Sequence, residues 1–110
     1  MLNPVTTRAE AQPTWMVRLR LEPGKEGRLP LTGDVESMVE LMYRTEDVCS
    51  VAVVPLRSGL AVAIGLAAPD AHAALERARG LATCSARYAR LGQTSVLDVH
   101  VTPEPAAAVA

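Results

Sequence analysis

The sequence has very few aromatic residues: one tryptophan, two tyrosines and no phenylalanine in 110 positions. A hydrophobic core must therefore be built from the aliphatic residues and methionine that dominate the 49% hydrophobic content. The net charge of −1 provides no overall field that would attract nucleic acid or an anionic membrane. No stretch approaches the ~18 consecutive apolar residues that a membrane span requires. These absences leave a single globular domain as the expected organisation.

Cysteine is scarce too, and its pattern carries no site. Cys49 and Cys84 are isolated, without the CxxC or Cys/His spacing of a metal centre. We therefore expect no metal and no cofactor, and we expect both thiols to be buried as small hydrophobic groups. Residues 1–13 have neither the basic start nor the apolar run of a signal peptide, so we expect a cytoplasmic protein with reduced cysteines. The glycines of residues 23–28 match neither a P-loop nor a dinucleotide-binding fingerprint.

Four segments have the composition of β-strands. Residues 15–22, 60–67 and 95–101 alternate in hydrophobicity with the period of two that marks a half-buried strand, and residues 48–56 are rich in valine. The turn signal Arg57-Ser58-Gly59 predicts that the second and third strands form a hairpin. We expect a flexible lead-in over residues 1–13, one domain over 14–102 and a flexible tail over 103–110.

Two segments have helical spacing. In residues 34–44, apolar side chains recur at i, i+3, i+4 and i+7, starting at Val35. A second helix is predicted from Pro69, where an alanine- and leucine-rich stripe extends to Ala82. Gly80 could weaken or end this helix. Residues 85–93 fit either a helical extension or a loop.

The resulting order, β-α-β-β-α-β, resembles the ferredoxin-like fold, an α+β arrangement. It implies a four-stranded antiparallel sheet, with strand order 4-1-3-2 and both helices on one face. The alternation assigns these residues to the helix-covered face: Trp15, Val17, Leu19, Leu21, Cys49, Val51, Val53, Leu60, Val62, Ile64, Leu66, Leu97, Val99 and Val101. The opposite face, called the open face below, would hold Met16, Arg18, Arg20, Ser50, Ala52, Val54, Ala61, Ala63, Gly65, Ala67, Val96, Asp98 and His100.

The open face supplies the candidate site residues, and it is divided. One half carries charge, and its ligand-binding candidates are Arg18, Arg20, Asp98 and His100, where the two arginines could grip a carboxylate or phosphate. The alternative is an ordinary cross-strand ion-pair cluster. No nucleophile accompanies Asp98 and His100 at a motif spacing, so we assign no catalytic residue.

The other half of the open face is small and apolar. Its interface candidates are Ala61, Ala63, Gly65 and Ala67, which would suit close approach by another backbone. The alternative is that alanine is simply abundant in this chain. RNA-binding sheets of this topology stack bases on aromatic residues of the central strands, and none stands there, so we expect no nucleic acid.

At the level of topology, residues 14–102 resemble two ferredoxin-like groups. One comprises the ACT-like regulatory domains, which bind small metabolites, and the turn Pro23-Gly24 looks like theirs. The other comprises the dimeric α+β barrels of the antibiotic-monooxygenase type. The leading interpretation is a non-catalytic regulatory or interaction module that binds a small anionic ligand at the open face and forms a homodimer. A small barrel enzyme and a pure protein-docking module are the alternatives.

Overall fold

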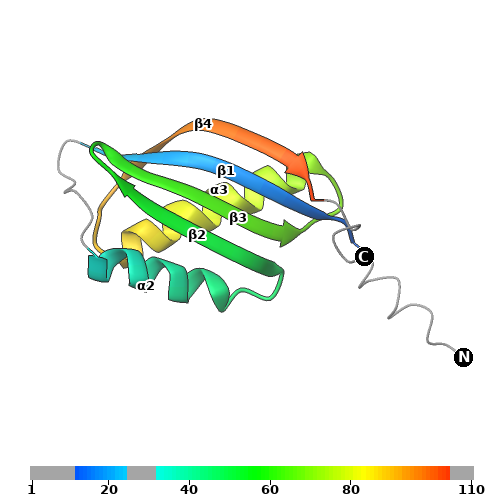
Figure 1. Ribbon diagram of the computed structural model, residues 1–110, viewed down its shortest axis with the longest axis horizontal. Coiled ribbons are helices and arrows are strands. Elements are labelled where there is room, and N and C mark those ends of the chain that lie inside the picture. Colours follow the sequence, from blue (N-terminus) through cyan, green and yellow to red (C-terminus); the bar gives the residue numbers. More distant parts are fainter. Residues whose placement is uncertain (1–11, 25–31, 105–110) are drawn as a thin grey trace, which may run out of the picture.

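The computed structural model describes residues 12–24 and 32–104 (Figure 1). The elements follow the order β1 (Thr14–Pro23), α2 (Thr32–Tyr43), β2 (Val48–Leu56), β3 (Gly59–Ala67), α3 (Ala71–Tyr88) and β4 (Thr94–Pro103). All neighbouring strands are antiparallel, in the order β2-β3-β1-β4. Both helices lie on one side of this sheet (Figure 1). The ferredoxin-like prediction is therefore confirmed. Most of the expected lead-in and tail, and the loop positions 25–31, lie outside the described residues.

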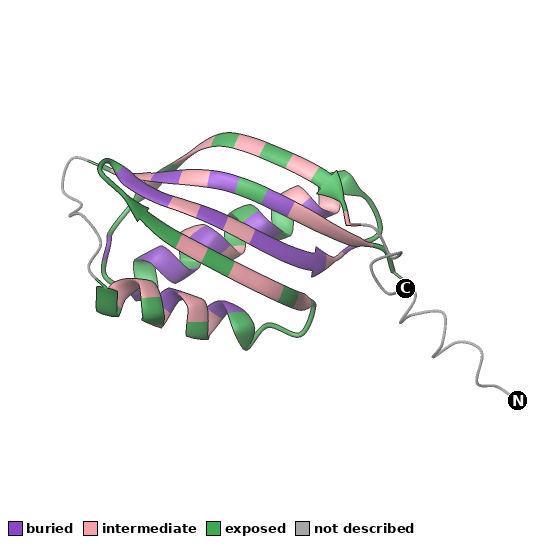
Figure 2. Ribbon diagram, in the orientation of Figure 1, coloured by how far each residue is buried: buried purple, intermediate pink, exposed green. Residues whose placement is uncertain are grey.

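The core lies between the sheet and the helices, where the predicted alternation is largely confirmed (Figure 2). The central strands bury Val17, Leu19 and Leu21 of β1 and Leu60, Val62, Ile64 and Leu66 of β3. The α2 helix contributes Met38 and Met42, and α3 contributes the buried alanines Ala74, Ala78, Ala82 and Ala86. Because alanine adds little bulk, α3 can lie close to the sheet without aromatic side chains between them.

The α3 helix resolves the ambiguity over residues 85–93. The Asp70 side chain accepts a hydrogen bond from the Ala73 N–H at 2.8 Å and caps the N-terminus. The helix then continues through Gly80 to Tyr88. It ends where the Leu91 N–H bonds to the Ala86 carbonyl at 2.9 Å, a 6→1 closure of the kind that commonly ends helices. Residues 85–88 are thus a helical extension, and the loop starts after them.

The predicted assignment of β4 residues to the two faces of the sheet was wrong for the first half of the strand. Arg18 pairs with His100 but Arg20 pairs with Leu97, so one extra residue is inserted in β4 between these positions. Asp98 within this bulge has a φ of 50°, a left-handed conformation that aspartate tolerates better than most residues. Before the bulge, the residues of β4 therefore face the opposite sides from those that the alternation predicted. Val96 therefore packs against the core, whereas Leu97, opposite Arg20, lies on the open face.

A second irregularity corrects the prediction for the cysteines. The β2–β3 register shifts between Val48 and Ser50, so Val48 joins Val51 and Val53 against the core. Cys49 at the shift is exposed, as is Cys84 on α3, and both are free thiols. The expectation that they are buried small hydrophobic groups was therefore wrong.

Candidate functional site

The open face of the sheet is organised as rows of residues that face one another across the four strands. One row runs Val54, Ala61, Arg20 and Leu97 from β2 to β4, and the next runs Ala52, Ala63, Arg18 and His100. A third row runs Ser50, Gly65, Met16 and Thr102. The first two rows share one profile: a small residue occupies β3, and an arginine follows on β1.

This profile produces an open depression of about 260 Å³ at the first two rows. Its floor is formed by Ala52, Ala61 and Ala63, and Val54 stands at the β2 side. Arg18, Arg20 and Asp98 line the opposite side. The alanines make the sheet surface low between the longer side chains, so the sequence pattern itself creates the hollow. Its volume is slightly below the ~300–1,000 Å³ common for ligand pockets.

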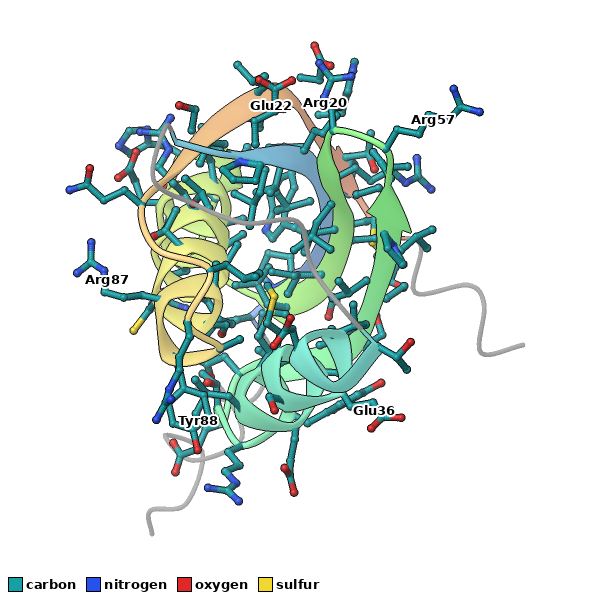
Figure 3. All side chains as sticks on the ribbon, turned by 90° about the vertical axis from the view of Figure 1, so that its left-hand side faces the viewer. Arg20, Glu22, Glu36, Arg57, Arg87 and Tyr88 are labelled. Atoms are coloured by element: carbon teal, nitrogen blue, oxygen red, sulfur yellow. The ribbon has the colours of Figure 1, made fainter. Side chains whose placement is uncertain are left out.

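Ion pairs hold Arg20 in place beside the depression. Its Nη2 lies 3.1 Å from Asp98 Oδ2 and 4.0 Å from Glu22 Oε2. Arg20 and Glu22 project from the side of the sheet that faces away from the helices (Figure 3). The Asp98 side chain remains 62% exposed, so solvent screens the pair and its stabilising contribution is small. The pair instead fixes the position of the arginine, and it offsets that arginine's charge.

Arg18 and His100 are placed side by side but differ in their relation to the depression. They face each other across β1 and β4, and both are exposed. Within residues 12–24 and 32–104, neither makes an ion pair or side-chain hydrogen bond. Arg18 lines the depression, and His100 does not. Among the described residues, Arg18 is therefore the cation beside the hollow that pairs with no carboxylate.

The four small interface candidates do not form one continuous exposed surface. Ala61 and Ala63 lie in the depression, but Gly65 is buried. A Cβ placed on Gly65 would collide with Ser50 Oγ and would lie 3.2 Å from Glu104 Oε1. The close approach predicted for this glycine is thus made by the chain's own side chains. Ala67 lies beyond the depression, where its carbonyl accepts a hydrogen bond from Arg77 at 2.9 Å.

Sequence reasoning placed Ala52 and Val54 on the open face without assigning them to the site. Their membership follows from the hairpin register, since Leu56 pairs with Gly59 across the turn and this sets Val54 opposite Ala61. Glu104, which covers Gly65, was assigned to the tail. No signal in the sequence pointed to it.

Within the described ranges, no three metal-ligating side chains gather in a way that could hold an ion. None of the helices described is both long and apolar enough to cross a membrane. Comparisons with protein-family models, with curated proteins and with solved structures gave no match. The function proposed below therefore rests on the geometry of the open face.

Proposed function

We propose that this protein is a non-catalytic binding module whose open face takes a small organic anion. The apolar part of the ligand would lie on the alanine floor, and its carboxylate or comparable anionic group would meet Arg18. One observation carries the proposal: Arg18, which makes no ion pair within the described residues, stands beside the alanine floor of a hollow whose other charged side chains, Arg20 and Asp98, pair with each other. A guanidinium presents its donors in a planar fork that suits a carboxylate, and it stays charged at any physiological pH.

The geometry favours binding over catalysis. Asp98 faces Arg20 at 3.1 Å, so its carboxylate is engaged by a cation. His100 lies outside the hollow. An acid–base pair would need both groups within reach of a substrate that sits in the depression. A barrel enzyme built on these two residues is therefore the weaker proposal.

Self-association through the same face is a second candidate function. Val54 is 53% exposed and Leu56 is 38% exposed, and both project from the edge strand beside the alanine floor. An identical chain packed across a two-fold axis would cover these side chains together with the hollow. This arrangement would enclose a ligand between two sheets, so it is compatible with the first proposal.

A binding assay with matched ligands and matched variants tests the anion proposal. The probes are a panel of small aliphatic and aromatic carboxylates, each paired with its neutral amide, measured by saturation-transfer NMR and calorimetry. We expect carboxylates to bind and amides to bind more weakly. Arg18→Gln should lower affinity roughly 5- to 30-fold, which corresponds to about 1–2 kcal/mol. Ala63→Leu should abolish binding because it fills the hollow.

Two control variants carry the same substitutions elsewhere. Arg44→Gln removes an arginine that directly follows α2 and lies 3.8 Å from Glu40. Ala71→Leu adds bulk at the exposed start of α3. Both should bind as the wild type does. The proposal fails if no carboxylate in the panel binds, or if Arg18→Gln and Arg44→Gln bind equally well.

A further inference from the structure

A second recess lies on the other side of the molecule, along the line where α3 meets the edge strand β4. It consists of two adjoining depressions of about 500 and 280 Å³ that share Thr83 and Thr94. On the helix side the lining residues recur at helical spacing, so they form one face of α3: Glu76, Arg79, Gly80, Thr83 and Arg87. On the strand side the recess is lined by Thr94 and Val96.

The backbone of β4 faces outward along this recess. The Gln93 carbonyl accepts a hydrogen bond from the Gly24 N–H at 2.9 Å, so it points toward β1. Backbone groups alternate in direction along a strand, so the peptide groups of Ser95 and Leu97 also point toward β1. The peptide groups of Thr94 and Val96 point away from the sheet, and β4 has no neighbouring strand on that side within the described sheet.

The opposite edge of the sheet, formed by β2, is protected at two positions, and this distinguishes it from the β4 edge. The outward N–H of Val51 in β2 donates to the Tyr43 hydroxyl at 3.3 Å. Pro55 lies four residues further along β2 and has no N–H that another strand could pair with. Edge strands are commonly protected in such ways against pairing with other chains. At β4, the bulge at Asp98 interrupts the edge, so the unpaired outward backbone is limited to the residues before Asp98.

The helix side of the recess adds charge and space. Arg79 and Arg87 are exposed and have no ion pair within the described ranges, and Figure 3 shows Arg87 extending outward from α3. Gly80 lies between them in the helix, and a Cβ at this position would meet nothing within 4 Å. Packing within the chain therefore does not require a glycine here, although glycine disfavours a helix. The missing side chain widens the recess beside the outward backbone of β4.

We propose that this recess is a docking site for a short, extended, acidic segment of another protein. The segment adds to the sheet as a fifth strand by pairing with the backbone of Thr94 and Val96. Its carboxylates lie against Arg79 and Arg87, which outnumber the one acidic side chain of the recess, Glu76. Backbone pairing requires the bound segment to be extended, and the two arginines select for acidic side chains in it.

The test uses three ten-residue fluorescent peptides and the full chain. One peptide alternates valine and glutamate, one replaces glutamate with lysine, and one keeps glutamate but is N-methylated at alternate residues. We expect only the first to bind by fluorescence anisotropy. The double variant Arg79→Glu/Arg87→Glu should weaken binding at least tenfold, whereas Arg44→Glu should not. In the complex, hydrogen exchange at the Thr94 and Val96 amides should slow.

Gly80 variants separate occupancy of the recess from the stability of the fold. Gly80→Gln should block the peptide while keeping or raising the melting temperature, and Gly80→Ala should bind nearly as well as the wild type. Binding of the N-methylated peptide as strongly as the parent would overturn strand addition. Equal affinity for the lysine peptide would overturn the charge selection. Concentration-dependent protection of Thr94 and Val96 without peptide would show a second copy of this chain there, and that would also overturn the proposal.

Discussion

The guanidinium of Arg20 lies 3.1 Å from the carboxylate of Asp98, and this contact joins β1 to the bulge in β4. Bulges commonly redirect a side chain beside a functional surface. Here the bulge sets an aspartate next to one of two arginines on the open face. The consequence is asymmetric: Arg20 is paired, and Arg18 is left available beside the alanine floor.

The first prediction concerns the backbone at Asp98. Asp98→Asn removes the charge but keeps a residue that tolerates a positive φ. Because the Asp98 side chain is 62% exposed, we expect Asp98→Asn to lower the free energy of unfolding by less than about 1 kcal/mol. Asp98→Val also forces a β-branched residue into the left-handed region, which should cost about 1–2 kcal/mol more. Urea unfolding followed by Trp15 fluorescence measures both, with Asp98→Gly as the control for backbone strain. Equal losses for Asn and Val would contradict the bulge geometry.

The second prediction concerns the cover over Gly65. Gly65→Ala should lower the free energy of unfolding by about 1–3 kcal/mol, because the new methyl group meets Ser50 Oγ. Ser50→Ala should cost little alone and should recover much of the loss in the double variant, giving a coupling of at least about 0.5 kcal/mol. Gly33→Ala is the control, since a Cβ there meets nothing within 4 Å. Additive effects of the two changes would show that the contact does not exist in solution.

The third prediction concerns self-association through the open face. A buried charge at the centre of an apolar contact is costly, so Ala63→Glu should convert a dimer to a monomer. Sedimentation velocity at tens of micromolar reads this directly. Ala71→Glu, at the exposed start of α3, should leave the dimer intact. A monomeric wild type, or a dimer unaffected by Ala63→Glu, would refute this interface.

Most of the fold could be predicted from periodicity, because buried core residues recur at every second position along β1 from Val17 and along β3 from Leu60. The central strands have the correct residues on the core face, and the turn Arg57-Ser58 fixes the pairing of β3 with β2. The two errors in phase, at Cys49 and at Leu97, both lie at register shifts. A bulge inserts one residue without any change in hydrophobic composition, so alternation alone could not locate it.

The candidate site was predicted in part. The sequence placed Arg18, Arg20, Asp98, Ala61 and Ala63 on one face, and the structure brings these five together at the depression. The sequence could not separate Arg18 from Arg20, because the ion pair with Asp98 depends on where the bulge falls. Nor could it show that Gly65 is covered, since Glu104 follows the last strand and reaches back over the sheet.

The most direct test of the central claim uses the alanine methyl groups that form the floor of the depression. Protein labelled with ¹³C at alanine methyls is titrated with the best-binding carboxylate from the panel and then with its amide. The carboxylate should shift the methyls of Ala52, Ala61 and Ala63 and give intermolecular nuclear Overhauser effects to them. The buried α3 methyls of Ala74 and Ala78 should stay unchanged, and Arg18→Gln should weaken the response. Shifts confined to other alanines, or none at saturating carboxylate, would contradict a binding site on the open face.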